Sequence, residues 1–238
     1  MQKTFGYLAL ALVMAIVLFR GASSCEKPDF LKDNPPKRHP DSVRTKVPPP
    51  RAPVAHFSVF REEFEDNGNK WSIREEAGRS YAIVDGRYRM NNRADKTFYW
   101  SNISAPGLSD SLDYIVETKL VKLSGINNNS YSVIWGLDNT ASRFYAFGIT
   151  GDGQYRVSRF ENRTWTDLIA LKNAKIIRKK DNQENVLTIQ KKGFKLYFLI
   201  NGKQVDTLPV YPLFGNGIGF GLNSPMEIEV DYIRVERL

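Results

Sequence analysis

The sequence predicts an all-β fold of antiparallel strands, arranged as a sandwich or a barrel. From Phe57 onward, apolar residues recur with period two, the spacing of a half-buried strand and not of a helix. In residues 113–121, for example, Tyr114 and Val116 fall on one face and Glu117 on the other. Turn dipeptides separate such runs at intervals of about 8–12 residues, which is typical of antiparallel sandwiches and barrels. These dipeptides are Asp85-Gly86, Asp152-Gly153, Lys192-Gly193 and Asn201-Gly202.

Further alternating runs predict strands over residues 131–137, 143–150, 154–161, 185–191 and 194–201. Thr164–Lys180 is ambiguous, because its apolar residues also fit one side of an amphipathic helix. Its all-β surroundings favour a strand, a loop and a short strand.

The last run of the chain, residues 227–235, contains a change of parity. Ile228 and Val230 alternate in one register, whereas Ile233 and Val235 alternate in the other. A β-bulge near Asp231 would keep all four side chains on the core side.

Three glycines, at positions 217, 219 and 221, recur with period two and leave one face of a predicted strand without side chains. Close packing within the sandwich is the favoured explanation. Close approach of a ligand is the alternative.

The first 25 residues have the parts of a secretory signal. Lys3 precedes an apolar run, Phe5–Phe19, which is shorter than the ~20 residues of a membrane-spanning helix. Cys25 follows the small residues 22–24, and this resembles a bacterial lipoprotein signal whose cysteine is lipidated, although Ala22 stands where that pattern usually has leucine. A plain cleaved signal and an uncleaved anchor are the alternatives. Export to the bacterial cell envelope is expected, with lipid anchoring through Cys25 as the favoured form.

Residues 26–56 form a predicted proline-rich, disordered linker, and residues 57–238 the folded domain. The linker holds eight of the 12 prolines and a charge of +3, and the signal adds +2. Of the total charge of +8, only +3 therefore belongs to the domain. This mild basicity gives no reason to expect a nucleic-acid partner.

Composition excludes several site types. One cysteine allows no intramolecular disulfide and no thiolate-rich zinc site. Of the two histidines, only His56 is near the domain, so a nucleophilic triad is not supported. No phosphate-binding loop of the G-x-x-x-x-G-K type occurs in the sequence.

Seven short motifs, in this order, cover some 175 residues and resemble the concanavalin A-like lectin/glucanase superfamily. More closely, they are similar to bacterial laminin-G-like and family 16 glycosidase-like jelly-roll modules. The motifs are Phe64–Trp71, Tyr81–Tyr88, Arg143–Tyr155, Asn185–Gly193, Leu196–Val205, Gly217–Leu222 and Val230–Val235. The resemblance implies a jelly-roll sandwich of two antiparallel sheets, a fold that hosts lectins, glycosidases and spacers alike.

Glycosidases of this superfamily use paired carboxylates on one strand. The nearest match is the acidic trio Glu227, Glu229 and Asp231, the candidate catalytic residues if the chain is a glycoside hydrolase-like enzyme acting on a polysaccharide or disaccharide. Its place on the terminal strand favours a structural role instead. No cofactor is expected apart from a calcium ion, for which Asp66 and Asp231 are candidate ligands.

Aromatic and arginine side chains indicate carbohydrate binding, since flat rings stack on sugars and polar groups bind hydroxyls. The candidates are Tyr99, Trp100, Trp135, Arg143, Tyr145, Tyr155, Arg159 and Trp165. Burial in the core is the alternative for any one of these aromatic rings, and it is their commoner role in a sandwich. The sequence therefore favours a non-catalytic module that binds a glycan or cell-envelope polysaccharide. A glycoside hydrolase-like enzyme comes second, and a structural or protein-interaction module third.

Overall fold

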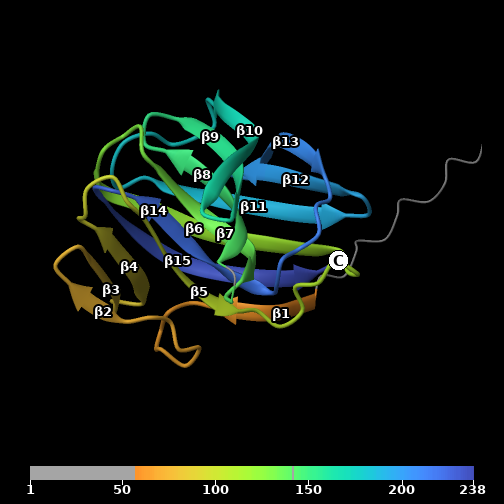
Figure 1. Ribbon diagram of the computed structural model, residues 1–238, viewed down its shortest axis with the longest axis horizontal. Helices are drawn as coiled ribbons and strands as arrows, with labels where there is room; N and C mark the ends of the chain where they lie inside the picture. Colours follow the sequence, from red (N-terminus) through yellow and green to blue (C-terminus); the bar gives the residue numbers. More distant parts are fainter. Residues whose placement is uncertain (1–56, 141) are drawn as a thin grey trace, which may run out of the picture. The chain divides into compact units, whose positions relative to one another are not determined.

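The computed structural model describes residues 57–140 and 142–238. The predicted signal segment 1–25, its Cys25 and the predicted linker 26–56 lie outside the described residues, and so they stay predictions. Within the described ranges the chain forms fifteen strands and no helix, which confirms the all-β prediction (Figure 1). Accordingly, no helix long and apolar enough to cross a membrane is found among these residues.

Nine strands form one antiparallel sheet, in the order β13-β12-β11-β6-β15-β4-β3-β2, with β1 also paired to β15. Their bounds are β1 (Phe57–Glu62), β2 (Arg74–Glu76), β3 (Arg79–Val84), β4 (Arg87–Asn92), β6 (Tyr114–Gly125), β11 (Glu184–Lys192), β12 (Lys195–Ile200), β13 (Lys203–Pro209) and β15 (Met226–Arg237). Six strands form the second sheet, in the order β10-β9-β8-β7-β14-β5. Their bounds are β5 (Phe98–Ser104), β7 (Ser130–Asp138), β8 (Arg143–Thr150), β9 (Gln154–Glu161), β10 (Thr164–Asn173) and β14 (Gly217–Asn223).

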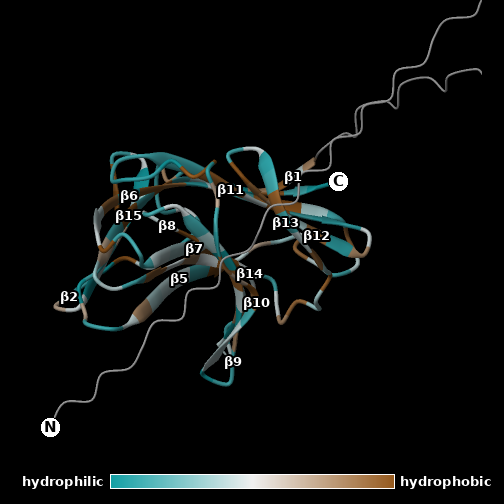
Figure 2. Cartoon of the chain, turned by 90° about the horizontal axis from the view of Figure 1, so that it is seen from above, coloured by the Kyte–Doolittle hydropathy of each residue, from teal (hydrophilic) through white to brown (hydrophobic). Residues whose placement is uncertain are grey.

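The chain passes back and forth between the two sheets. β5 and β14 belong to the six-stranded sheet, but the strands that follow them, β6 and β15, belong to the nine-stranded one. Figure 2 shows β6, β11 and β15 in one layer and β5, β10 and β14 in the other. This arrangement is the two-sheet jelly roll that the motif order predicts.

The core lies between the sheets and is rich in aromatic rings. Phe64 stacks on Tyr88 and Trp71 on Phe220, with ring centroids 5.3 and 5.2 Å apart. Buried Glu62 supports this group by accepting hydrogen bonds from the Trp71 indole N–H at 3.0 Å and from the Phe64 amide at 2.7 Å. Both sheets and their shared core lie within residues 57–238, and the chain from Arg51 to Leu238 forms one compact unit, so this part can fold independently.

The β-bulge predicted near Asp231 is confirmed, because the register of β15 against β6 shifts between Val230 and Tyr232. As a result Ile228, Val230, Ile233 and Val235 are all buried. The predicted turn dipeptides are confirmed as well, since each joins two consecutive strands.

Thr164–Lys180 begins as a strand, β10, and continues as a loop, as expected. The second, short strand predicted there is wrong. Residues 174–183 form turns, which are held in place by Asn185 because its side chain bonds the amide and the carbonyl of Arg178 at 2.9 and 3.0 Å. The backbone groups of Arg178 are thus satisfied by a side chain, whereas the Asn182 amide donates to the Lys122 carbonyl of β6 at 2.7 Å.

Candidate functional site

The outer face of the six-stranded sheet has a floor of small side chains. The register pairs Gly221 with Ser132, Ser132 with Gly148, and Gly148 with Arg156, so these four residues form one row across β14, β7, β8 and β9. Paired residues of antiparallel strands point to the same side of a sheet. The row is therefore a shallow trough that ends at the Arg156 guanidinium.

Two aromatic rings from opposite edges of the same sheet meet over this floor. Phe98 lies on β5 and Trp165 on β10, yet their ring centroids are only 5.0 Å apart, with planes at 82°. In a flat sheet, five strand spacings would separate these edges by about 24 Å. The sheet therefore curves, and its outer face is concave.

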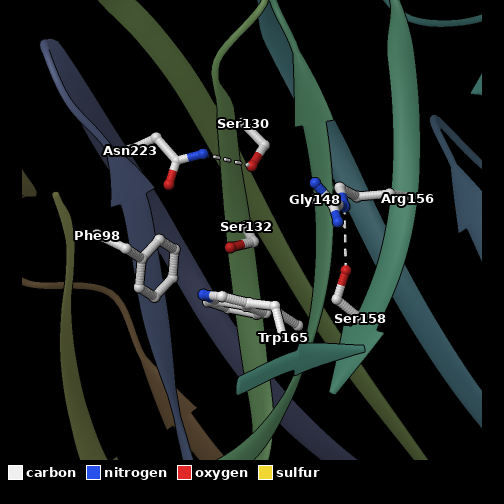
Figure 3. A pocket seen from close by; sticks show the side chains of 9 residues that line it. Phe98, Ser130, Ser132, Gly148, Arg156, Ser158, Trp165 and Asn223 are labelled. Carbon is white, nitrogen blue, oxygen red and sulfur yellow. Dashed lines mark hydrogen bonds between the residues drawn. The ribbon is translucent and has the colours of Figure 1, made fainter. Parts of the chain in front are cut away.

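A cavity of about 220 Å³ lies between this floor and these rings (Figure 3). It is lined by Phe98, Ser130, Ser132, Ala146, Gly148, Arg156, Ser158, Trp165 and Asn223. A second cavity, of about 530 Å³, adjoins it and shares Phe98, Trp165 and Asn223 with it. The second volume is in the range of about 300–1,000 Å³ that is usual for ligand pockets, and the first is somewhat smaller.

Polar groups in the cavity are held in fixed orientations. Arg156 forms an ion pair with Asp167 and donates from Nε to the Ser158 hydroxyl at 3.0 Å, and Ser158 in turn donates to Asp167 at 2.8 Å. On the other side, the Asn223 amide donates to Ser130 Oγ at 3.2 Å. A guanidinium has five N–H donors and a primary amide has two, so both keep donors beyond these bonds.

This combination of groups suits a neutral, polyhydroxylated ligand. The exposed part of Trp165 (39% of the residue) offers an apolar surface, and the arginine, amide and hydroxyl groups offer hydrogen bonds at fixed positions. The Asp167 carboxylate offsets the charge of Arg156, which makes a purely anionic ligand a poorer match.

Two of the predicted ligand-binding aromatics are on this face. Trp165 lines both cavities. Trp100 packs with Phe98, Phe144 and Phe160 in an aromatic layer beside the cavity, at centroid distances of 6.2, 5.5 and 6.2 Å.

Three other predicted aromatics lie on the opposite side of the sheet, inside the core. Trp135, Tyr145 and Tyr155 are exposed by only 1, 3 and 4%. Burial raises the pKa of Tyr145 and Tyr155 to about 12, and each donates its hydroxyl to a backbone carbonyl, those of Pro212 and Val205. Their placement corrects the sequence-based set, because rings buried between the sheets present no face to a ligand.

Arg143 and Arg159 lie at the rim of the sandwich and take part in ion pairs. Arg143 pairs with Asp138 at 2.8 Å and lies over the Phe214 ring at 5.1 Å, and both arginines approach Glu161, at 3.8 and 3.7 Å. Tyr99, on β5, is partly buried against the core beneath Arg79. None of the three lines the two cavities.

The acidic trio is on the outer face of the other sheet, in β15. Glu229 pairs with Arg89 and lies 3.6 Å from Arg87, and Glu227 lies 3.9 Å from Arg89. Asp231 pairs with Lys119 and lies 3.9 Å from Arg87. These carboxylates alternate with cations across neighbouring strands, as in a cross-strand charge ladder.

The two candidate calcium ligands have other partners. Asp66 accepts the Gly68 amide at 2.7 Å, and Asp231 is in the ladder just described. Among residues 57–140 and 142–238, no group of three or more His, Cys, Asp or Glu side chains could hold a metal ion.

The glycines of β14 bear out the packing explanation. A Cβ at Gly221 would lie 2.2 Å from the Phe98 ring, and one at Gly217 would lie 2.9 Å from Leu137. Gly221 thus leaves room for the Phe98 ring, which is a wall of the cavity.

Comparison with known proteins shows the fold. No family model matches the chain, and no curated protein is similar to it in sequence. Among solved structures, it is similar to the carbohydrate-binding module CBM66 from Bacillus subtilis (TM-score 0.52, 16% identity, 70% of this chain and 94% of that one). It is similar, too, to a Bacillus subtilis protein of unknown function with a galectin-like fold (TM-score 0.55, 12% identity, 76% of this chain and 96% of that one). A third similar structure is the Bacillus licheniformis β-glucanase (TM-score 0.55, 10% identity, 75% of this chain and 97% of that one). The described domain therefore has the two-sheet jelly-roll fold of these structures.

Proposed function

We propose that this protein is an exported, lipid-anchored module that binds a glycan or cell-envelope polysaccharide without catalysing a reaction on it. The observation that carries the proposal is the cavity on the concave face, where Phe98 and Trp165 wall a floor of small side chains and polar groups. Aromatic walls with a few fixed polar groups are the usual composition of a small-molecule site. The similarity to a carbohydrate-binding module and to a galectin-like fold supports the same function.

Within this site, we assign sugar stacking to Trp165 and hydroxyl binding to Arg156, Ser158 and Asn223. The first cavity takes one sugar unit, and the neighbouring units extend past Asn223 into the second cavity, since the two share that residue and both rings. The ion-paired acids of β15 have a structural role in this proposal.

A glycan array of bacterial envelope polysaccharides, probed with the compact unit Arg51–Leu238, tests the binding function. We expect binding to a small set of glycans and a loss of at least about tenfold in affinity for Trp165→Ala. Phe194→Ala, which alters an exposed ring remote from the cavities, is the matched control and should bind normally. Failure of the unaltered protein to bind any polysaccharide would overturn the proposal.

Anchoring has a separate test. Metabolic labelling of the full chain with a fatty acid in a bacterial host should label the protein, and Cys25→Ala should abolish the label. Equal labelling of both forms, or of neither, would contradict a lipid anchor at Cys25.

A further inference from the structure

The turn between β11 and β12 presents an unusually exposed aromatic ring. Phe194 is 92% exposed, the highest value among the large apolar side chains of the described residues. It follows the turn Lys192-Gly193 and precedes Lys195, and both lysines are exposed. The turn thus displays a phenyl ring between two cationic side chains.

This turn is held rigidly from both sides. The Gly193 amide donates to Asp113 Oδ1 at 2.8 Å, and the Val210 amide donates to the Phe194 carbonyl at 3.1 Å. Lys191 donates to the same carboxylate at 3.2 Å, so its charge is offset by Asp113. The Phe194 ring is exposed on this turn, and its apolar surface stays in water unless a partner covers it.

The same end of the nine-stranded sheet holds the start of the described chain. The register aligns Lys191 with Tyr114, Tyr114 with Arg237, and Arg237 with Phe57. Figure 1 shows the start of β1, the C-terminus and the β11–β12 turn at one side of the domain. Phe57 is itself 65% exposed, so a second aromatic ring lies at this end.

The sequence that precedes Phe57 fixes the kind of partner. Residues 26–56 carry a net charge of +3, and before them come Cys25 and the apolar run Phe5–Phe19. Exposed apolar side chains such as Phe enter the boundary between headgroups and acyl chains, and basic residues are attracted to anionic headgroups. Exposed rings and exposed lysines both occur at the end of the domain where the described chain begins, and the sequence before that point leads back to the predicted anchor.

We propose that this end of the domain is a membrane-contacting surface, with Phe194 inserted between lipid headgroups and Lys192 and Lys195 bound to anionic phospholipid. The contact would hold the domain against the bilayer in one orientation. It is independent of glycan binding, because it uses a different sheet and different residues.

Co-sedimentation of the unit Arg51–Leu238 with vesicles tests the proposal, since this unit has no predicted lipid anchor. We expect binding to phosphatidylcholine vesicles that contain phosphatidylglycerol, and little binding to pure phosphatidylcholine. Phe194→Ser should weaken binding about tenfold, and Lys192→Glu with Lys195→Glu should weaken it more. Raising the salt from about 0.1 M to 1 M should also weaken it, as the Debye length falls from about 10 to about 3 Å.

The matched control is Ile73→Ser. Ile73 is 53% exposed and directly precedes β2, which lies at the opposite side from β12 in both Figures 1 and 2. This variant should bind vesicles normally.

Three results would each overturn the proposal: no binding of the unaltered unit to anionic vesicles, equal binding by Phe194→Ser, or equal losses for Phe194→Ser and Ile73→Ser. Loss of glycan binding in Phe194→Ser with vesicle binding unchanged would assign the turn to the glycan and would likewise overturn it.

Discussion

The nine-stranded sheet covers its outer face around β15 with paired charges, whereas the six-stranded sheet covers much of its own with aromatic rings. On β15 and β4, Glu229 and Arg89 neutralise each other, and they stay accessible to water in part. On β8, Phe144 is fully buried although it lies on the outer side of the sandwich. On the first face, paired charges satisfy one another. On the second face, apolar rings are shielded from water only where they pack against other rings. Beyond the rings lies the cavity, and that is where we place function.

The largest expected effect tests whether the aromatic layer is a second small core. Phe144 contacts Trp100, Phe160 and Trp165 at centroid distances of 5.5, 5.1 and 5.7 Å. Phe144→Ala should lower the free energy of unfolding by about 3 kcal/mol, as for a ring in an interior. Urea unfolding of the unit Arg51–Leu238 measures this. A loss below about 1 kcal/mol would mean that the layer is ordinary surface.

Removing the partly exposed ring should separate stability from binding. Trp165→Ala should lower the free energy of unfolding by only about 1–2 kcal/mol, because 39% of the residue is already exposed. A stability loss of this size leaves the variant folded. The loss of glycan affinity, at least about tenfold, should therefore come from the missing ring and not from unfolding. Isothermal titration on protein shown to be folded gives the affinity, and urea unfolding of the same variant gives the free energy of unfolding. Unchanged affinity would remove Trp165 from the site.

Substitution of the paired charges on the outer face of β15 should change the free energy of unfolding only slightly. Glu229→Gln should lower stability by less than about 1 kcal/mol, since Arg89 is 40% exposed and keeps Glu227 nearby. High salt should shrink the effect further. Glycan binding should not change. If glycan hydrolysis is detected and Glu227→Gln or Glu229→Gln abolishes it, the structural role assigned to these acids is wrong.

A further effect, of similarly small size, concerns a contact between the two sheets. Asp206, on β13, accepts hydrogen bonds from Lys172 on β10 at 2.6 Å and from Tyr155 on β9 at 3.2 Å. Burial alone would raise the pKa of Asp206, but the hydrogen bonds from Lys172, the Thr207 amide and Tyr155 hold it below its ordinary value.

A carboxyl with a lowered pKa stabilises the fold above its ordinary pKa, and this stabilisation is lost as the pH falls through the lowered value. Asp206→Asn should therefore cost about 0.5–1 kcal/mol at pH 7, and the difference from the unaltered protein should vanish toward about pH 2. Unfolding followed across this range checks the sign. A difference that persists at low pH would show that the effect does not come from ionisation.

The periodicity of the sequence predicted many of the strands, the turn dipeptides and the bulge, but it gave no bounds for β1 to β5 and it wrongly suggested a short strand before Lys180. It shows which residues share a face, but not which face points to the core. Tyr145 and Tyr155 were therefore named as ligand-binding candidates, whereas both face the core. Their hydroxyls reach backbone carbonyls at the edge of the core, and such partners cannot be recognised from strand spacing.

The site also depended on residues that sequence reasoning passed over, chiefly Phe98, Arg156, Ser158 and Asn223. One signal was available: small residues recur with period two at Ser130 and Ser132 and again at Ala146 and Gly148. A face without large side chains in two consecutive strands suggests a concavity. The contact between Phe98 and Trp165 could not be predicted from the sequence, because it results from the curvature of a sheet whose edge strands are far apart in sequence.

Nuclear magnetic resonance mapping tests the central claim most directly, namely that ligand binds on the concave face of the six-stranded sheet. The unit Arg51–Leu238 would be titrated with the polysaccharide that binds best on the array. The account predicts shifts of the Gly148 and Arg156 amides and of the Trp165 indole N–H, with Arg89 and Glu229 unchanged. Shifts confined to Arg89, Glu229 and their neighbours on β15 would contradict it.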